Sequence, residues 1–157
     1  VLVYLPFEHQ DETTAWLQGF ADHTFIQYSA DVTDEQQGNV TRRKANISGF
    51  KRDLAASRGV ICNSGFELIS ECLQWKKPVL TRPLAQQMEQ LSNAAALEQL
   101  GYATTMKSLE TKTARAWLND MPTAPDVHFK NVATALAEWL ARGGSRPVTE
   151  LSKQLWS

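Results

Sequence analysis

Three small polar residues followed by two glutamates form the part of the sequence best suited to binding an anion. The stretch GVICNSGFELISE, residues 59–71, passes from β-branched residues through Asn63, Ser64 and Gly65 into apolar residues at helical spacing. The N–H groups of a helix's first turn and the helix dipole attract phosphate, and small residues let it approach the backbone. Ser64 would add a hydroxyl donor to such a site. The alternative is that Ser64 only caps the helix and Gly65 only eases the turn.

Glu67 and Glu71 lie four residues apart, so the predicted helix presents both carboxylates on one face. A like-charge pair at this spacing costs a few tenths of a kcal/mol, of which Glu67 recovers a part from the dipole of the first turn. Beside a bound diphosphate, the Glu71 carboxylate would accept hydrogen bonds from vicinal sugar hydroxyls, as acidic residues do for ribose in nucleotide-binding folds. The alternative is that the two side chains form a solvated helix face.

The elements that would position these residues alternate between strands and helices. Apolar, β-rich runs predict strands at residues 1–5, 23–29, 39–45, 59–62, 78–82 and 102–106. Helical spacing predicts helices over 9–20, 48–58, 65–75, 86–101, 108–119, 126–142 and 148–156, with Ser48 as the cap of the second and a polar loop over 30–38. This alternation predicts one α/β domain over residues 1–157, with a doubly wound parallel sheet, a core in 1–105 and further helices in 108–157. In such sheets ligands bind at the carboxyl ends of the strands, where the turn at 63–65 is expected.

Composition excludes several classes of protein. The 157 residues include 16 basic and 17 acidic side chains, so there is no excess positive field to attract nucleic acid. Cys62 and Cys72 lie in apolar stretches without CxxC or Cys/His spacing, which predicts buried thiols in a reducing compartment. No run approaches the roughly 20 apolar residues of a membrane span, and there is no signal-peptide pattern. We therefore expect a cytoplasmic location, and a start within a strand and without methionine predicts a fragment of a longer protein.

A second run, KKPVLTRPLAQQMEQLSNAAALEQLGYA at residues 76–103, extends the pattern over the next strand and helix. Prolines flank the strand, amide and acid side chains follow it, and a glycine closes the helix. This run and the first one together resemble the donor-binding signature of GT-B nucleotide-sugar glycosyltransferases, especially relatives of the peptidoglycan N-acetylglucosaminyltransferase. The resemblance covers most of residues 1–105 and rests on the order Gly65, Glu71, Pro78, Pro83, Gln90, Asn93, Ala94.

The resemblance implies the Rossmann-like, carboxy-terminal half of a two-domain GT-B enzyme, which binds a nucleotide diphosphate-sugar in the cleft that faces the other half. Glu89 stands where relatives often carry another amide, which leaves the identity of the sugar open. The implied site consists of Ser64, Gly65 and Phe66 for the diphosphate, Glu71 for the ribose, Gln86, Gln87, Glu89 and Gln90 for the sugar, Phe50 and Lys51 for the base, and Glu67 and Asn93 as supporting residues.

Three alternatives and one departure stand beside that assignment. Phe50 is alternatively a core anchor, Lys51 a solvated charge, and Asn93 a residue that only supports the loop. Many GT-B enzymes have a glycine-rich turn after the first strand of this half, but here PFEHQDE follows that strand, so the loop cannot cradle phosphate in the same way. No histidine has a partner at metal-ligand spacing and no Asp-x-Asp sequence occurs, so we expect no metal and no cofactor, with UDP or a UDP-sugar as the ligand.

The expected function is donor binding for the transfer of a hexosyl group within a full-length glycosyltransferase. The resemblance places the general base on an N-terminal acceptor-binding domain, which we expect to be absent from residues 1–157. The fragment alone would then bind its donor weakly without catalysing transfer, and any peripheral membrane association would come through the missing half. The alternatives are a donor-binding subunit that needs a separate acceptor subunit, half of a nucleotide-sugar epimerase, or a non-catalytic α/β interaction module.

Overall fold

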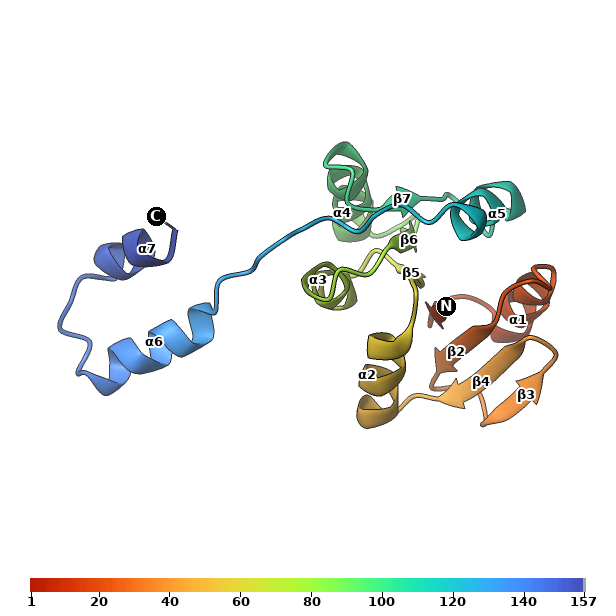
Figure 1. Ribbon diagram of the computed structural model, residues 1–157, viewed down its shortest axis with the longest axis horizontal. Coiled ribbons are helices and arrows are strands. Elements are labelled where there is room, and N and C mark those ends of the chain that lie inside the picture. The colour runs from red at the N-terminus through yellow and green to blue at the C-terminus, as the bar shows by residue number, and fades with distance from the viewer. Residues whose placement is uncertain (157) are drawn as a thin grey trace. The chain divides into compact units, whose positions relative to one another are not determined.

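The computed structural model describes residues 1–156, which divide into two compact units. The first unit is Val1–Asp126, and the second begins at Val127. The first unit contains the sheet and five of the helices drawn in Figure 1, and the second contains the last two.

The first unit is built on a sheet of seven strands in the order β3-β4-β2-β1-β5-β6-β7. All neighbouring strands are parallel except β3 and β4, which form an antiparallel pair at one edge. The chain builds outward from β1 to β2 and β4 and then crosses back to β5, so the strand order reverses between β1 and β5. The strands are β1 Leu2–Tyr4, β2 Phe25–Ser29, β3 Glu35–Gln37, β4 Val40–Lys44, β5 Val60–Asn63, β6 Val79–Arg82 and β7 Thr104–Thr105.

Helices cover both faces of this sheet, which confirms the predicted doubly wound α/β architecture. Figure 1 shows α2, α3 and α4 on one side of the strands and α1 and α5 on the other. This arrangement follows from the right-handed crossover that joins parallel strands. The helices are α1 Gln10–Gln18, α2 Ile47–Ala56, α3 Phe66–Gln74, α4 Met88–Gln99 and α5 Thr111–Asn119.

The main hydrophobic core lies between the sheet and the face formed by α1 and α5. The strands contribute β-branched and leucine side chains that are almost wholly buried, as expected of a parallel sheet covered on both faces. Three side chains of α5 also belong to this core, although the sequence predicted a core within residues 1–105. Its buried members are Val3, Leu5, Leu17, Phe20, Phe25, Val40, Ile61, Leu80, Met106, Ala114, Trp117 and Leu118. Both predicted buried cysteines are confirmed: Cys62 and Cys72 are free thiols inside the first unit.

Two local predictions are wrong. The polar loop expected over 30–38 contains β3, because a tight turn at Gly38, with φ of 59°, folds Glu35–Gln37 back onto β4. Helix α2 is capped by Asn46 instead of Ser48, since the Asn46 Oδ1 atom accepts a hydrogen bond of 2.7 Å from the Gly49 N–H.

The end of α4 follows the prediction. Gly101 adopts a left-handed conformation with φ of 69°. The N–H groups of Gly101 and Tyr102 donate to the carbonyls of Glu98 and Leu97, at 3.1 and 2.8 Å. These two bonds form the Schellman motif, for which glycine is favoured because it has no Cβ.

The second unit is a pair of helices, α6 Val132–Ala141 and α7 Val148–Trp156. Gly143 and Gly144 separate them with positive φ, as the sequence predicted. The indole N–H of Trp139 donates to the Arg146 carbonyl at 2.8 Å and ties the connecting turn to α6. Across residues 1–156, no helix is both long enough and apolar enough to cross a bilayer. Helix α5 belongs to the first unit, whereas the prediction that residues 1–157 form one single domain stays a prediction.

Candidate functional site

Two neighbouring hollows open at the carboxyl ends of β1 and β5, where the strand order reverses. In a doubly wound sheet this is the place where ligands bind. The hollows have volumes of about 380 and 470 Å³ and share Tyr4, Glu67 and Leu68 as lining residues. The smaller, the α2 hollow, is further lined by Asn46, Ile47, Phe50, Lys51 and Glu71. The larger, the α4 hollow, is further lined by Phe7, Asn63, Gly65, Phe66, Glu89 and Gln90.

The N-terminus of α3 lines the α4 hollow, the next two residues of the helix line both hollows, and the helix has no side-chain cap. Gly65 occupies the cap position in an extended conformation, with φ of −70° and ψ of 140°, and Phe66 is the first helical residue. A Cβ built on Gly65 would meet no atom within 4 Å. The protein's own packing therefore does not require glycine here, and the space in front of the helix is open. The first N–H groups of a helix have no intrahelical partner, so this end of α3 can accept an anion.

Ser64 does not play either role proposed for its side chain. Its hydroxyl is fully buried, and its Oγ atom lies 2.8 Å from Thr81 Oγ1 on β6. Because Thr81 Oγ1 donates its own proton to the Cys62 carbonyl at 3.1 Å, the Ser64 hydroxyl is the donor in this pair. It neither caps α3 nor points toward a ligand. Only backbone N–H groups remain for an anion at this turn.

Two asparagines hold the turn from neighbouring elements. Asn93, on α4, donates from Nδ2 to the Ser64 carbonyl at 3.0 Å. Asn63, the last residue of β5, donates from Nδ2 to the Arg82 carbonyl at 3.0 Å, while its Oδ1 atom is buried without a hydrogen-bond partner. The contact of Asn93 is the supporting one that the sequence analysis allowed for. Both bonds bring the end of β5 and the start of α3 into a defined geometry relative to β6 and α4.

Aromatic rings form the inner wall of the α2 hollow. Phe50 is half-buried between Tyr4 and Tyr28, with ring centroids 5.4 and 5.1 Å apart in edge-to-face arrangements. Phe50 therefore packs in the fold and also lines the hollow, and its role in recognising a base stays a prediction. Lys51 is exposed at the rim. Glu71 is half-buried and lines the same hollow, four residues after Glu67.

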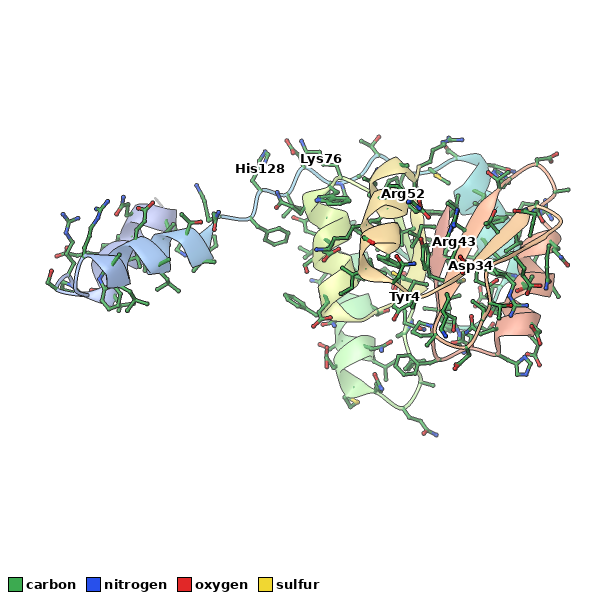
Figure 2. All side chains as sticks on the ribbon, turned by 90° about the horizontal axis from the view of Figure 1, so that it is seen from below. Tyr4, Asp34, Arg43, Arg52, Lys76 and His128 are labelled. Atoms are coloured by element: carbon green, nitrogen blue, oxygen red, sulfur yellow. The ribbon has the colours of Figure 1, made fainter. Side chains whose placement is uncertain are left out.

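An ionic network around the buried Asp53 carboxylate connects α2 to β2 and β4 behind that wall. The Asp53 carboxylate accepts a hydrogen bond of 2.7 Å from the Tyr28 hydroxyl and pairs with Arg43 and Arg52 at 3.2 and 3.0 Å. Arg43 and Arg52 come from β4 and α2 and are labelled in Figure 2. Burial and the bond to Asp53 raise the pKa of Tyr28 to about 12. Although burial opposes it, hydrogen bonds from Arg52 and Tyr28 lower the pKa of Asp53 below its ordinary value.

The amide-rich loop before α4 and the first turn of that helix contain four predicted residues, of which the two in the helix line the α4 hollow. Gln90 is buried, and its Oε1 accepts from the Leu84 N–H at 3.1 Å while its Nε2 donates to Gln87 Oε1 at 2.9 Å. Gln90 thus shapes the loop as well as lining the hollow. Glu89 is exposed and lines the hollow directly, whereas Gln86 and Gln87 are exposed without being lining residues.

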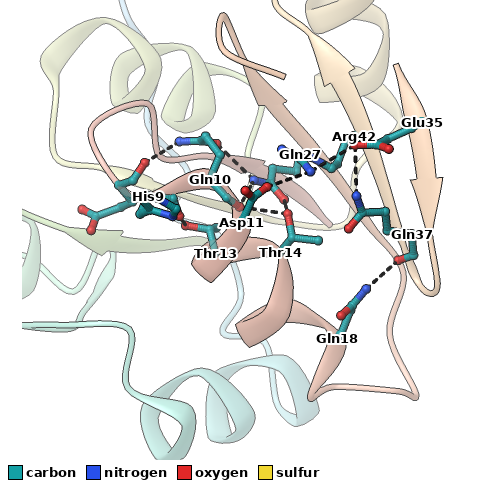
Figure 3. A network of polar contacts seen from close by, with 11 residues as sticks. His9, Gln10, Asp11, Thr13, Thr14, Gln18, Gln27, Glu35, Gln37 and Arg42 are labelled. Carbon is teal, nitrogen blue, oxygen red and sulfur yellow. Dashed lines mark hydrogen bonds and ion pairs between the residues drawn. The ribbon is translucent and has the colours of Figure 1, made fainter. Parts of the chain in front are cut away.

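The first loop, which lacks the glycines of many GT-B enzymes, is held by side chains instead. Gln10 Nε2 donates to the carbonyls of Leu5 and Glu8 at 2.9 and 2.7 Å. The Gln27 amide in turn donates to Gln10, and Thr14 donates to Gln27 at 2.7 Å, as Figure 3 shows. This network ties α1 and the loop to β2.

An ion pair between Glu8 and Arg82 joins the same loop to the end of β6. Asn63 was predicted only as part of the small-residue turn, and Tyr4, Phe7 and Arg82 were not predicted as site residues. Their position at or just after the carboxyl ends of predicted strands was the signal that could have identified them.

The two hollows carry more negative than positive charge. Glu67, Glu71 and Glu89 line them, with Lys51 as the basic side chain. The partial positive charge at the N-terminus of α3 lies among these carboxylates. In residues 1–156 there is no group of three His, Cys, Asp or Glu side chains that could hold a metal ion. Burial raises the pKa of the Cys72 thiol to about 12 and that of Cys62 well above its ordinary range, so neither thiol is a nucleophile here.

Comparison with known proteins agrees with this geometry. The profile of the family described as "Glycosyl transferase family 1" matches residues 1–122. A UDP-N-acetylglucosamine--N-acetylmuramyl-(pentapeptide) pyrophosphoryl-undecaprenol N-acetylglucosamine transferase from Clostridium botulinum strain 657 is 33% identical over 106 residues, which are 64% of this chain and 29% of the relative. The chain therefore spans less than a third of the curated relative that it matches.

Two solved structures share the fold. The glycosyltransferase SnogD from Streptomyces nogalater superposes with a TM-score of 0.56 at 17% identity, over 76% of this chain and 34% of that one. The solution structure of ALG13 superposes with a TM-score of 0.60 at 14% identity, over 88% of this chain and 92% of that one. The chain belongs to glycosyl transferase family 1, and its first unit has the Rossmann-like, doubly wound fold of one half of a GT-B glycosyltransferase.

Proposed function

We propose that the first unit is the donor-binding domain of a glycosyltransferase and holds a nucleotide diphosphate-sugar, with UDP as the nucleotide. The observation that carries this proposal is the uncapped N-terminus of α3, whose Gly65 and Phe66 line the α4 hollow with Glu89, while Glu71 of the same helix lines the neighbouring α2 hollow. A helix N-terminus attracts phosphate, and the two hollows leave room for the nucleoside and for the sugar.

In this proposal, each part of the donor has its own place. The diphosphate lies against the backbone N–H groups of Gly65 and Phe66. The ribose hydroxyls donate to the Glu71 carboxylate in the α2 hollow, where Phe50 and Lys51 contact the base. The sugar lies in the α4 hollow beside Glu89 and Gln90. Glu67 and Asn93 support the turn and the face of α3, and Ser64 contributes its backbone only.

The chemistry of transfer sets what these groups would do. Negative charge builds on the diphosphate oxygens as the sugar departs, so fixed N–H donors aimed at them stabilise the transition state more than the ground state. Each such donor is worth about 3 kcal/mol by analogy with oxyanion holes. The acceptor must also lose a proton. We propose that the general base belongs to an N-terminal acceptor-binding domain of the full-length protein, so that residues 1–157 alone bind the donor without transferring its sugar.

Calorimetric titration with UDP, GDP, dTDP and their glucose conjugates tests the proposal. We expect UDP to bind, and Glu71→Ala to weaken UDP by at least about tenfold, because hydrogen bonds to a carboxylate are worth about 1.5–3 kcal/mol. Glu98→Ala is the matched control, since Glu98 is an exposed glutamate on α4 that lines neither hollow. Absence of binding by every nucleotide, or equal affinity of Glu71→Ala and wild type, would refute donor binding at this site.

A second candidate is a donor-binding subunit that pairs with a separately encoded acceptor-binding chain. It is kept as a second candidate because the solved ALG13 chain, 92% of which superposes, consists almost entirely of this fold. An antibody raised against the first unit separates the two candidates in extracts of the source organism. If the antibody detects a protein much larger than 157 residues, the two-domain enzyme is supported. If it detects a protein of about this size, and sugar transfer by that protein requires a second added polypeptide, the subunit is supported. A cytoplasmic location is part of both candidates.

A further inference from the structure

Two exposed phenylalanines flank the α4 hollow. Phe7, in the first loop, is 64% exposed, and Phe66, in the first turn of α3, is 69% exposed. They come from separate elements, and both rings leave most of their apolar surface in water. Phe7 is held there by the loop that Gln10 and the Glu8–Arg82 ion pair position. A flat apolar ring at the wall of a polar hollow gains most when a ligand with an apolar face covers it.

The charged side chains of the same hollow are acceptors. Glu67 and Glu89 are the charged residues that line it, and no lysine, arginine or histidine is among its lining residues. Asn63 lies at the same hollow, is 6% exposed, and has an Oδ1 atom without a partner. The nearby arginine, Arg82, is already paired with Glu8. Away from the backbone N–H groups of Gly65 and Phe66, a ligand group in this hollow is therefore favoured if it offers hydroxyl donors and disfavoured if it carries negative charge.

We propose that the α4 hollow selects an uncharged hexosyl group on the donor and discriminates against acidic sugars. The apolar C–H face of a pyranose ring packs on Phe7 and Phe66, and its hydroxyls donate to the Glu89 carboxylate. A hexuronosyl group would bring a second carboxylate beside Glu89 and Glu67, where like charges repel. Phe7 and the Phe66 ring thereby determine sugar affinity, and Glu89 determines charge selection. This inference rests on the proposed donor-binding function.

A matched pair of ligands isolates the charge. UDP-glucose and UDP-glucuronate differ at C6 by a carboxylate, so calorimetry of the full chain with UDP, UDP-glucose and UDP-glucuronate compares the two directly. We expect UDP-glucose to bind about tenfold more tightly than UDP-glucuronate at low ionic strength, with the gap narrowing as salt is added. Glu89→Gln should strengthen UDP-glucuronate by about fivefold and leave UDP unchanged. Glu98→Gln, on the same helix but outside the hollow, should change none of the three affinities.

The aromatic walls are tested separately. Phe7→Ala should lower the affinity for UDP-glucose by about fivefold and leave the affinity for UDP as in wild type. Most of the advantage of UDP-glucose over UDP should thereby be lost. Phe66→Ala should act in the same direction because it keeps the backbone N–H groups of α3. Trp75→Ala removes an exposed ring at the opposite end of α3 and should leave the ratio of the two affinities unchanged. Circular dichroism of each variant confirms that the fold is intact.

The outcomes separate the inference from the proposed function. If UDP binds but UDP-glucuronate binds as tightly as UDP-glucose, the charge selection is wrong and donor binding stands. An equal effect of Glu89→Gln on all three ligands, or no effect of Phe7→Ala on the ratio of UDP-glucose to UDP, would also overturn the inference. If UDP, UDP-glucose and UDP-glucuronate all fail to bind, both the proposed function and the inference fall.

Discussion

The bond from Asn93 to the turn before α3 offers a test that needs no ligand. Asn93 lies in the middle of α4, half-buried, and its Nδ2 atom donates to the Ser64 carbonyl at 3.0 Å. Replacement by alanine removes the donor and leaves the carbonyl without this partner. Because Ser64 directly precedes Gly65, the same change loosens the backbone whose N–H groups face the proposed diphosphate.

The expected magnitude combines two opposing effects. Loss of a hydrogen bond of this kind costs about 1 kcal/mol of unfolding free energy. Alanine has a higher helix propensity than asparagine, which raises the free energy of unfolding by about 0.5 kcal/mol. Asn93→Ala should therefore destabilise the protein by a net value of about 0.5 kcal/mol. Ser92→Ala, at an exposed neighbouring position, gains propensity alone and should stabilise the protein by about 0.5 kcal/mol. The two variants should differ by about 1 kcal/mol.

Urea unfolding followed by tryptophan fluorescence measures this difference, because Trp117 lies in the core of the first unit. A thermal scan should show the two variants separated by about 2–4 °C. Asn93→Ala should also bind UDP more weakly than Ser92→Ala does. If Asn93→Ala is as stable as Ser92→Ala, the hydrogen bond does not support the turn and the reasoning about its geometry fails.

Three further changes follow from close contacts and charges. Gly49→Ala would place a Cβ 2.6 Å from Asn46 Oδ1 and displace the cap of α2, which should lower the free energy of unfolding by about 1 kcal/mol. Because the cap is then already lost, adding Asn46→Ala in a double-mutant cycle should lower the free energy of unfolding only a little further. Gly59→Ala would bring its Cβ within 2.8 Å of the Trp117 ring, which should destabilise by about 1–3 kcal/mol in urea unfolding. The pKa of Asp53 is lowered in the folded state, so the ionised carboxylate contributes to the free energy of unfolding at any pH above the unfolded pKa near 3.9. That contribution is lost as pH falls through the folded pKa, and Asp53→Asn should flatten the acid limb of a pH–stability profile; an unchanged limb would contradict the assignment.

Most of the fold could be predicted because its signal is local. Apolar β-rich runs identified six of the seven strands, and helical spacing identified every described helix, including α7 with its residues 148–156. The missed strand, β3, consists of Glu35, Gln36 and Gln37, which have no apolar pattern. It forms because the turn at Gly38 returns the chain to β4, so backbone pairing decides it. Helix α6 begins at Val132, later than predicted, where the Asn131 side chain accepts from the Thr134 N–H at 3.0 Å.

The candidate site could be predicted only as an order of residues along the chain. The pattern from Gly65 to Asn93 identified the turn, the glutamates and the loop that meet at the sheet edge. It could not show that the Ser64 hydroxyl turns inward to Thr81, since that contact joins residues 17 positions apart, one in the turn after β5 and one on β6. Nor could it show that Gln90 bonds to its own loop, or that Phe7 reaches the same hollow as Phe66. The functional roles of these residues stay predictions until the titrations are done.

The amino-acid sequence by itself determined the alternation of strands and helices, the burial of the two cysteines and the place of the small-residue turn before α3. Each of these depends on hydrophobic spacing or turn chemistry within a few neighbouring residues. Only the tertiary structure decided which polar groups remain available to a ligand, because that depends on partners brought together from distant segments. The Ser64 hydroxyl is hydrogen-bonded to Thr81, and the Ser64 carbonyl accepts a hydrogen bond from Asn93. The first loop places the Phe7 ring at the wall of the α4 hollow.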